Sequence, residues 1–357
     1  MPVIVKLPSG GITKCKQISN LQAKVGSAVA GYVKLIWTNP SDPKFKGLEI
    51  FYKEGSEPTQ HGDGTKCYDS NDGLVATTKE ITGLADGRTY YFRAFAYTYK
   101  NATRVYTEIK DGAIISATPQ QLKGKVVITS SQTWTVPEGV EFIDVFLVGA
   151  GGGAKVNYNE VVSNQGGGGG GYTKTIKNIA VNPGSKHSVT IGAGVVGEAG
   201  GTTRFDNHSA NGGGTAFNPN YGGKGGSAGG KNGGVNNAEQ GASDGRSCGS
   251  TPGQGSTTKE FGENNGTLYS GGGGGGAIGY DSFEWLTVYP ANGGAGGGGK
   301  GGSRVEKKGW GSRCTKGIDG TPGTGGGGGG CVAEGELSAS SYHTQGGSGV
   351  CIIRWGY

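Results

Sequence analysis

Three uninterrupted runs of six glycines, at 166–171, 271–276 and 325–330, constrain the folding of this chain more than any other feature. Glycine loses more conformational freedom on folding than any other residue, so a folded glycine run needs compensating interactions. A polyproline II backbone makes no internal hydrogen bonds, so each buried N–H and C=O group must pair with a neighbouring run. The runs therefore predict packed polyglycine II helices, and flexible linkers are the alternative.

Glycine also divides the chain. It supplies 14 of the first 148 residues and 65 of the remaining 209. Strand patterns occur in both parts and no amphipathic helix pattern competes, so the predicted fold class is all-β. We predict an N-terminal lead-in over residues 1–20, a β-sandwich over 21–118, a linker over 119–124 and a glycine-rich domain over 125–357.

The sandwich is predicted from alternating segments at Tyr32–Trp37, Leu48–Tyr52 and Thr89–Thr98, with turn signals between them. The stretch LADGRTYYFRAFA at 84–96 resembles the fibronectin type III pattern, although Asp86 stands where that pattern has proline. The resemblance implies that Tyr90 forms a tyrosine corner and that Trp37 is the buried tryptophan. It also implies that Leu84, Phe92, Ala94 and Ala96 face the core.

The glycine-rich part begins and ends with apolar strands. Residues 125–148 predict two strands around a Pro137–Gly139 turn, Tyr172–Val181 and His187–Ile191 predict two more, and Val350–Trp355 predicts the last. The simplest arrangement pairs the first and last strands in one sheet, from which the glycine runs project.

This part resembles the glycine-rich domains of bacteriophage tail proteins. The motifs are QTWTVPEGVEFIDVFLVGAGGG at 132–153, GGGGGGYTKT at 166–175, VNPGSKHSVTIGAG at 181–194 and GGSGVCIIRWGY at 346–357. In composition and alternation it is also similar to tail-fibre tip adhesins, whose polyglycine bundles carry variable receptor-binding loops. The resemblance implies a virion protein that contacts a bacterial host.

Sequence motifs typical of hydrolases and phosphate-binding loops occur in the chain, but they lack the neighbouring structure that these motifs need. GxSxG occurs at 225–229 and 241–245, but neither follows an apolar strand or opens a helix, as a nucleophile elbow requires. GxxxxGK at 294–300 continues with Gly301 where a phosphate-binding loop needs Ser or Thr. The six cysteines and four histidines are scattered. We therefore expect no enzyme activity, no cofactor and no metal site.

Charge and hydropathy exclude further classes. A net charge of +6 with 17% charged residues is no nucleic-acid signature. The N-terminal residues lack a signal-peptide pattern, and no apolar stretch reaches the roughly 18 residues of a membrane span. We expect no membrane insertion.

Insertions between the glycine runs are rich in aromatic, Asn, Ser and Asp residues, as recognition loops are. They include 154–165, 202–221, 279–292, 303–319 and 331–345. Six cations and one carboxylate lie between Lys300 and Lys316, which predicts a basic patch or a solvated loop. The candidate receptor-binding residues are Tyr280, Phe283, Trp285, Tyr289, Lys307, Lys308, Trp310, Arg313, Tyr342 and His343. Their alternative role is to cap the glycine bundle.

The resemblance to phage tail proteins, together with these insertions, implies a function. The protein is expected to be a phage tail or baseplate component, present in several copies, that binds a glycan or protein on the bacterial surface. It would contact other tail proteins and act outside the cell on the virion, after synthesis in the host cytoplasm. The alternative is a structural spacer or decoration without receptor binding. An ice-binding protein is a third possibility, but the insertions interrupt the flat face that it needs.

Overall fold

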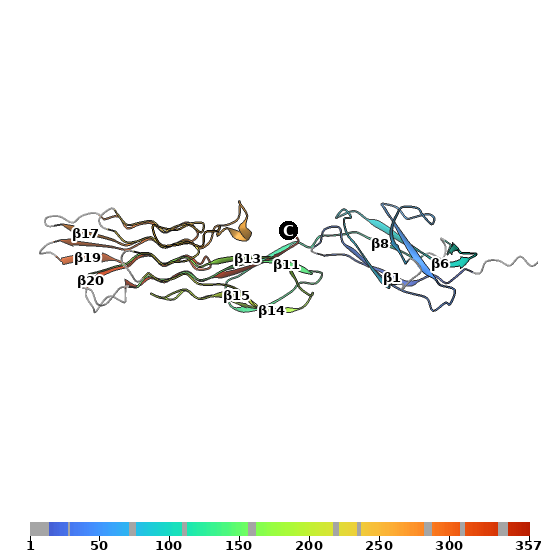
Figure 1. The fold of residues 1–357 in the computed structure, drawn as a ribbon, viewed down its shortest axis with the longest axis horizontal. Helices are drawn as coiled ribbons and strands as arrows, with labels where there is room; N and C mark the ends of the chain where they lie inside the picture. Colours follow the sequence, from blue (N-terminus) through green and yellow to red (C-terminus); the bar gives the residue numbers. More distant parts are fainter. Residues whose placement is uncertain are drawn as a thin grey trace, which may run out of the picture. The chain divides into compact units, whose positions relative to one another are not determined.

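The computed structural model describes residues 14–27, 29–70, 76–108, 113–155, 162–216, 221–233, 237–281, 288–307, 311–334 and 342–357. The regular structure of these residues is almost entirely β-strand, so the fold is all-β as predicted (Figure 1). No helix in the described ranges is long and apolar enough to cross a membrane. Contacts divide the chain into two units. One runs to Lys123 and includes Gly139–Glu141 and Gly356–Tyr357, and the other comprises Gly124–Glu138 and Phe142–Trp355.

The N-terminal unit is a sandwich of two antiparallel sheets. One sheet has the order β1-β2-β5, and in the other β4-β3-β6 continues with β7 and β8, which both pair with β6. Its strands are β1 (Ser19–Lys24), β2 (Val33–Thr38), β3 (Gly47–Glu54), β4 (Thr65–Asp69), β5 (Thr78–Ile81), β6 (Tyr90–Lys100), β7 (Thr103–Tyr106) and β8 (Ile114–Ala117). The sandwich thus begins at Ser19, inside the predicted lead-in.

Alternation along the strands builds the core between the two sheets. Trp37, Ile50 and Phe92 belong to one buried cluster with Leu84 and Ala94. The hydroxyl oxygen of Tyr90 accepts a hydrogen bond from the Ala85 amide at 3.0 Å, which is the contact of a tyrosine corner. A turn residue five positions upstream is thereby fixed to the start of β6.

The segment predicted as a linker is hydrogen-bonded to the N-terminal unit. The amide of Leu122 donates to the carbonyl oxygen of Ser27 at 2.8 Å, and the amide of Gly87 donates to Pro119 at 2.8 Å. Gln121 forms an isolated bridge with Ser27. Paired backbone of this kind behaves as part of a domain.

The second unit contains an antiparallel sheet with the strand order β13-β11-β21-β9. Its strands are β13 (Thr173–Ala180), β11 (Phe142–Val148), β21 (Val350–Trp355) and β9 (Gly124–Ile128). Ile352 pairs with Phe146 on one side and Val127 on the other. The prediction that the first and last strands share a sheet is confirmed.

The prediction of two strands over 125–148 is wrong, because the chain forms three. The additional strand β10 (Gln132–Thr135) leaves that sheet and pairs with β14 (Lys186–Thr190). A second sheet then continues through β15 (Thr203–Phe205) and β16 (His208–Ala210). The polar break at Ser130-Ser131 separates β9 from β10 and lets the chain change sheets.

A short segment around the 3-10 helix η2 (Glu260–Gly262) covers the first of these sheets. Phe261 packs in one cluster with Phe146, Val350 and Ile352. The guanidinium of Arg354 lies 3.9 Å from the centre of the Phe261 ring. Phe261 has a φ of 52°, a strained value for a bulky residue, which the burial of its ring compensates.

The six-glycine runs are packed laterally. Within 271–276, successive amides donate to three different neighbours, and each neighbour recurs at every third residue. The donor–acceptor pairs are Gly271–Gly296 and Gly274–Gly299, then Gly272–Ala242 and Gly275–Glu239, then Gly273–Gly168 and Gly276–Gln165. A period of three with bonds only between runs is the geometry of polyglycine II. The packed interpretation of the runs is therefore correct, and the linker alternative is not.

Close approach of the runs explains why side chains are absent. A Cβ atom built on Gly273 would overlap the carbonyl oxygen of Gly328, and one on Gly167 would overlap that of Gly273. Neighbouring backbones occupy the space that any side chain would need. The bundle thus replaces an apolar core with backbone hydrogen bonds between glycine runs.

Candidate functional site

All three six-glycine runs have short strands at one end of the bundle. β12 (Val162–Asn164) precedes the first run, while β17 (Ala277–Asp281) and β20 (Val332–Glu334) follow the other two. β12 pairs with β20, and β17 pairs with β18 (Ser303–Lys307), which pairs with β19 (Gly311–Thr315). We call these five strands the distal cluster. Figure 1 shows β17, β19 and β20 at the end of the unit opposite β11 and β13.

Three of the predicted receptor-binding residues belong to strands of the distal cluster. Tyr280 is in β17, Lys307 is in β18 and Arg313 is in β19. The three-stranded sheet therefore brings together positions from two separate insertions. Tyr289 belongs to the chain that returns from β17, and its side chain is 65% exposed. Phe283, Trp285, Lys308 and Trp310 lie outside the described residues.

The two remaining candidates, Tyr342 and His343, differ from Tyr289 in their surroundings. Tyr342 packs against Ala154 and Cys331, and His343 is only 8% exposed. Burial, together with the positive charge of Lys155, lowers the pKa of His343. The His343 ring is therefore an interior group and not the surface group that its sequence context predicted.

The basic insertion also presents fewer charges than its sequence contains. Arg304 is only 2% exposed. The ammonium of Lys316 lies 3.7 Å from the carboxylate of Asp319. Both cations were counted in the predicted patch, so the described part of this insertion offers fewer accessible cationic groups to a ligand than the sequence indicates.

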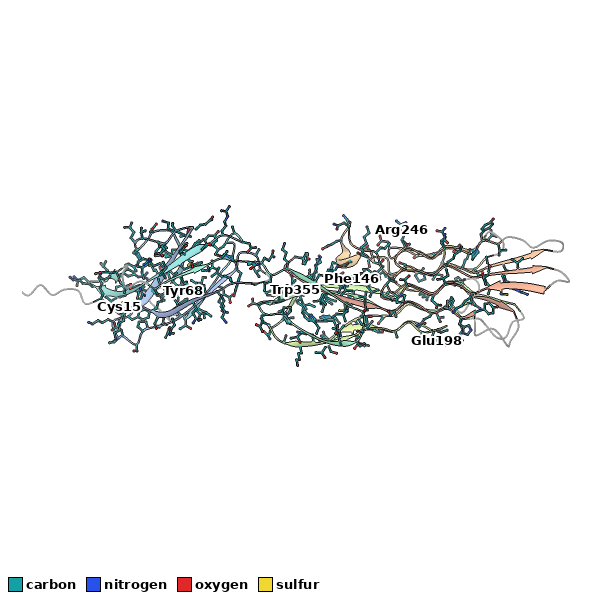
Figure 2. The ribbon with its side chains drawn as sticks, turned by 180° about the vertical axis from the view of Figure 1, so that it is seen from behind. Cys15, Tyr68, Phe146, Glu198, Arg246 and Trp355 are labelled. Carbon is teal, nitrogen blue, oxygen red and sulfur yellow. The ribbon has the colours of Figure 1, made fainter. Side chains whose placement is uncertain are left out.

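Sequence reasoning missed a pocket on the flank of the bundle. It is lined by Glu198, Thr215, Tyr221 and Lys224 and by the backbone of Gly214 and Gly222, with a volume of about 370 Å³. Figure 2 places Glu198 at the edge of the bundle, away from Phe146 in the sheet. Tyr221 closes one of the aromatic insertions, which was the available signal.

One arrangement has the order of a hydrolase triad. His187 Nε2 lies 3.1 Å from Ser185 Oγ, and His187 Nδ1 lies 2.7 Å from Asp206. However, the amides of Gly184 and Ser185 already donate to Val136 and Asn182, so they are not available as oxyanion donors. Asp206 also accepts from the Ser188 amide at 2.9 Å. The geometry thus fits a structural role, in which His187 and Asp206 tie β14 to the β15–β16 turn.

The two GxSxG serines have structural contacts as well. Ser227 is fully buried and its hydroxyl accepts from the Gly245 amide at 3.1 Å, while the Ser243 hydroxyl accepts from the Ala295 amide at 2.7 Å. Within the described ranges, no group of three or more His, Cys, Asp or Glu side chains is arranged to hold a metal ion. The described cysteines form no disulfide, and burial raises the pKa of Cys331 and Cys351 to about 12.

Comparison with known proteins identifies the second unit. No curated protein matches the chain. The glycine-rich domain family matches residues 127–356, a range that covers most of the two four-stranded sheets of the second unit, the polyglycine bundle and the distal cluster. That range is more than half of the chain, so the chain belongs to the glycine-rich domain family.

Proposed function

We propose that this protein is a bacteriophage tail or baseplate component that binds the bacterial surface through segments carried on its polyglycine bundle. The observation that carries the proposal is the distal cluster, in which all three six-glycine runs meet strands at one end of the bundle. Aromatic and polar segments follow β17, β18 and β20 in the sequence. Segments of this composition recognise ligands with few side-chain torsions to order.

The bundle suits such a role because it holds the strand stems rigidly. Its amides bond to neighbouring segments of the chain at 2.7–3.3 Å along 271–276 and 327–330. Stems fixed in this way lose little further entropy when a ligand binds. Sequence changes between the stems would leave the glycine contacts intact, which allows the recognised glycan or surface protein to vary.

The N-terminal unit is proposed to be a fibronectin type III module that joins the protein to its neighbours in the tail. Support comes from the sheet orders β1-β2-β5 and β4-β3-β6, from the Tyr90 corner and from the buried Trp37. Asp86, which departs from the family pattern, accepts a hydrogen bond from the Gly31 amide at 2.9 Å. A carboxylate thus fixes this turn where the family pattern has proline.

The proposal includes no enzyme activity, cofactor, nucleic acid or membrane insertion. Several copies on one virion would raise a weak single-site affinity by avidity. The site of action would be the virion outside the cell, after synthesis in the host cytoplasm.

The test is a binding assay with the purified full chain on a panel of candidate host bacteria. Replacing residues 280–289 by a short Gly-Ser link is expected to abolish binding, and Tyr289→Ser is expected to weaken it. The matched control is Ile318→Ser, since Ile318 is 58% exposed but lies outside the distal cluster. Undiminished binding after the replacement would refute this surface. Failure of the intact protein to bind any bacterium would favour the spacer role.

A further inference from the structure

The flank pocket differs from the distal cluster in both position and chemistry. Residues from three short segments of the chain line it: Glu198 and Ala199, Gly214 and Thr215, and Tyr221, Gly222 and Lys224. A volume of about 370 Å³ is within the range of small-ligand sites. Because none of these residues belongs to the distal cluster, an inference about the pocket does not depend on the adhesin proposal.

The backbone of the pocket is already paired. The Gly214 amide donates to the carbonyl oxygen of Lys224 at 2.7 Å, and the Gly214 carbonyl accepts from Gly169 at 2.9 Å. The Gly223 amide donates to Gly167 at 2.8 Å. Binding of an extended peptide by strand addition needs a row of unpaired amides and carbonyls, so this backbone does not favour a peptide ligand.

Side chains around this backbone offer hydrogen bonds of both kinds. The Thr215 hydroxyl donates to the carbonyl oxygens of Gly153 at 2.8 Å and Gly197 at 3.3 Å, so towards a ligand it is an acceptor. The Glu198 carboxylate is an acceptor, and one of its oxygens receives the Lys155 ammonium at 2.9 Å. Lys224 is an exposed donor. A ligand rich in hydroxyl groups can satisfy both kinds of partner.

Charge and shape narrow the class further. A phosphate or a carboxylate bound to Lys224 would also meet the negatively charged Glu198, part of whose charge the Lys155 ammonium compensates. The Tyr221 side chain is 50% exposed and supplies an aromatic face with a polar tip. The apolar face of a pyranose ring stacks on such a surface, while its hydroxyl groups bond at the ring edge. The other lining residues are Ala199, Gly214 and Gly222, whose side chains are small or absent.

We infer that the flank pocket is a binding site for a neutral saccharide, with the sugar ring stacked on Tyr221 and its hydroxyl groups bonded to Glu198, Thr215 and Lys224. Each of these groups has a defined function in the site. Tyr221 supplies contact area, Glu198 and Thr215 accept hydrogen bonds, and Lys224 donates.

The experiment uses the labelled full chain on an array of neutral oligosaccharides built from hexoses, deoxyhexoses and N-acetylhexosamines, with sulfated and phosphorylated counterparts. We expect binding to one or more neutral members. Tyr221→Ala should weaken the affinity for the best of them by about tenfold or more, since truncating an aromatic anchor removes most of its contact area. Tyr221→Phe should retain affinity within about threefold, because the ring remains.

Two further variants keep the result interpretable. Glu198→Gln preserves shape and should weaken binding several-fold through the loss of a charged acceptor. Tyr357→Ala removes an exposed tyrosine that belongs neither to the pocket nor to the distal cluster, and should leave saccharide binding unchanged. The inference would be overturned if no neutral member binds, if charged counterparts bind better, or if Tyr221→Ala binds like the parent. A third variant, Tyr289→Ala, probes the distal cluster: loss of saccharide binding in this variant but not in Tyr221→Ala would also overturn the inference, and would support the distal cluster as the glycan site.

Discussion

The backbone amide of Gly273 donates to the carbonyl oxygen of Gly168 at 2.8 Å. These two residues belong to different six-glycine runs, and each is enclosed by further runs. Gly168 donates in turn to Gly328 at 2.8 Å, so one chain of hydrogen bonds joins all three runs. The centre of the unit is therefore held by backbone contacts that tolerate no side chain.

Gly273→Ala is expected to destabilise the glycine-rich unit by about 2–3 kcal/mol, because the new Cβ meets the Gly328 carbonyl oxygen and forces two runs apart. The matched control is Gly214→Ala, where the nearest atom lies 3.2 Å from the added Cβ, and its cost should stay below about 1 kcal/mol. Differential scanning calorimetry should show a melting temperature about 5–10 °C lower for Gly273→Ala. Equal melting temperatures for the two variants would refute close packing at Gly273.

Arg354→Met should cost about 3 kcal/mol or more, because it leaves the Asp144 carboxylate without the guanidinium that lies 3.2 Å away. The Asp144 and Arg354 side chains are only 15% and 10% exposed, so little solvent replaces the lost partner. Methionine retains much of the packing over Phe261. Lys155→Met is the control, since its pair with Glu198 is exposed and should contribute under about 1 kcal/mol. Urea titration measures the free energy of unfolding of both variants, because urea, unlike guanidinium chloride, does not screen ion pairs. Similar costs for the two variants would contradict this account.

Tyr90→Phe is expected to destabilise the N-terminal unit by about 1–2 kcal/mol, because the Ala85 amide loses its acceptor in a half-buried turn. The neighbouring Tyr91→Phe removes the same atom from the opposite face of β6 and should have a smaller effect. Thermal unfolding of the two variants side by side provides the measurement. If Tyr91→Phe proved as costly, the loss would not belong to the corner contact.

Acid should weaken the loop that contains Asp63. The Thr59 amide and hydroxyl hydrogen-bond to this carboxylate and, with Lys53, lower its pKa to about 2. Because the pKa of Asp63 is lower in the folded than in the unfolded chain, ionised Asp63 stabilises the folded state. This stabilisation is fully present above the ordinary pKa of about 4 and is lost as the pH falls through about 2. Thr59→Val removes the hydroxyl and should move the Asp63 pKa upward. The carboxyl carbon chemical shift of Asp63, followed from pH 6 to pH 1.5, reports it, and an unchanged midpoint would contradict the assignment.

Local sequence pattern predicted much of the N-terminal unit. Strands near Val33–Thr38, Gly47–Glu54 and Tyr90–Lys100 follow from their alternation and turn residues. The sequence pattern did not predict that both faces of β6 are buried. Phe95 and Tyr97 are buried on the face away from Phe92, because His61 and Tyr106 pack over them. Coverage by a distant loop and hairpin leaves no periodic signal in the strand itself.

For the candidate sites too, the sequence predicted some features and only the structure showed the others. Composition indicated which insertions carry aromatic and charged residues, but it gave no information on burial. His343 and Arg304 read as surface groups and are interior ones, whereas Tyr221 and Glu198 meet only because separate segments fold against the same flank. Such meetings depend on contacts between residues far apart in the chain.

The sequence alone determined that the glycine runs must pack against one another, because an unpaired polyglycine backbone cannot offset the entropy lost on ordering it. It also determined the sheet that joins the first and last strands, since their apolar residues need a common core. Only the tertiary structure decided which runs are neighbours and where the insertions emerge. Every glycine offers the same amide and carbonyl, so the choice of partner is set by the strands and turns at the ends of each run.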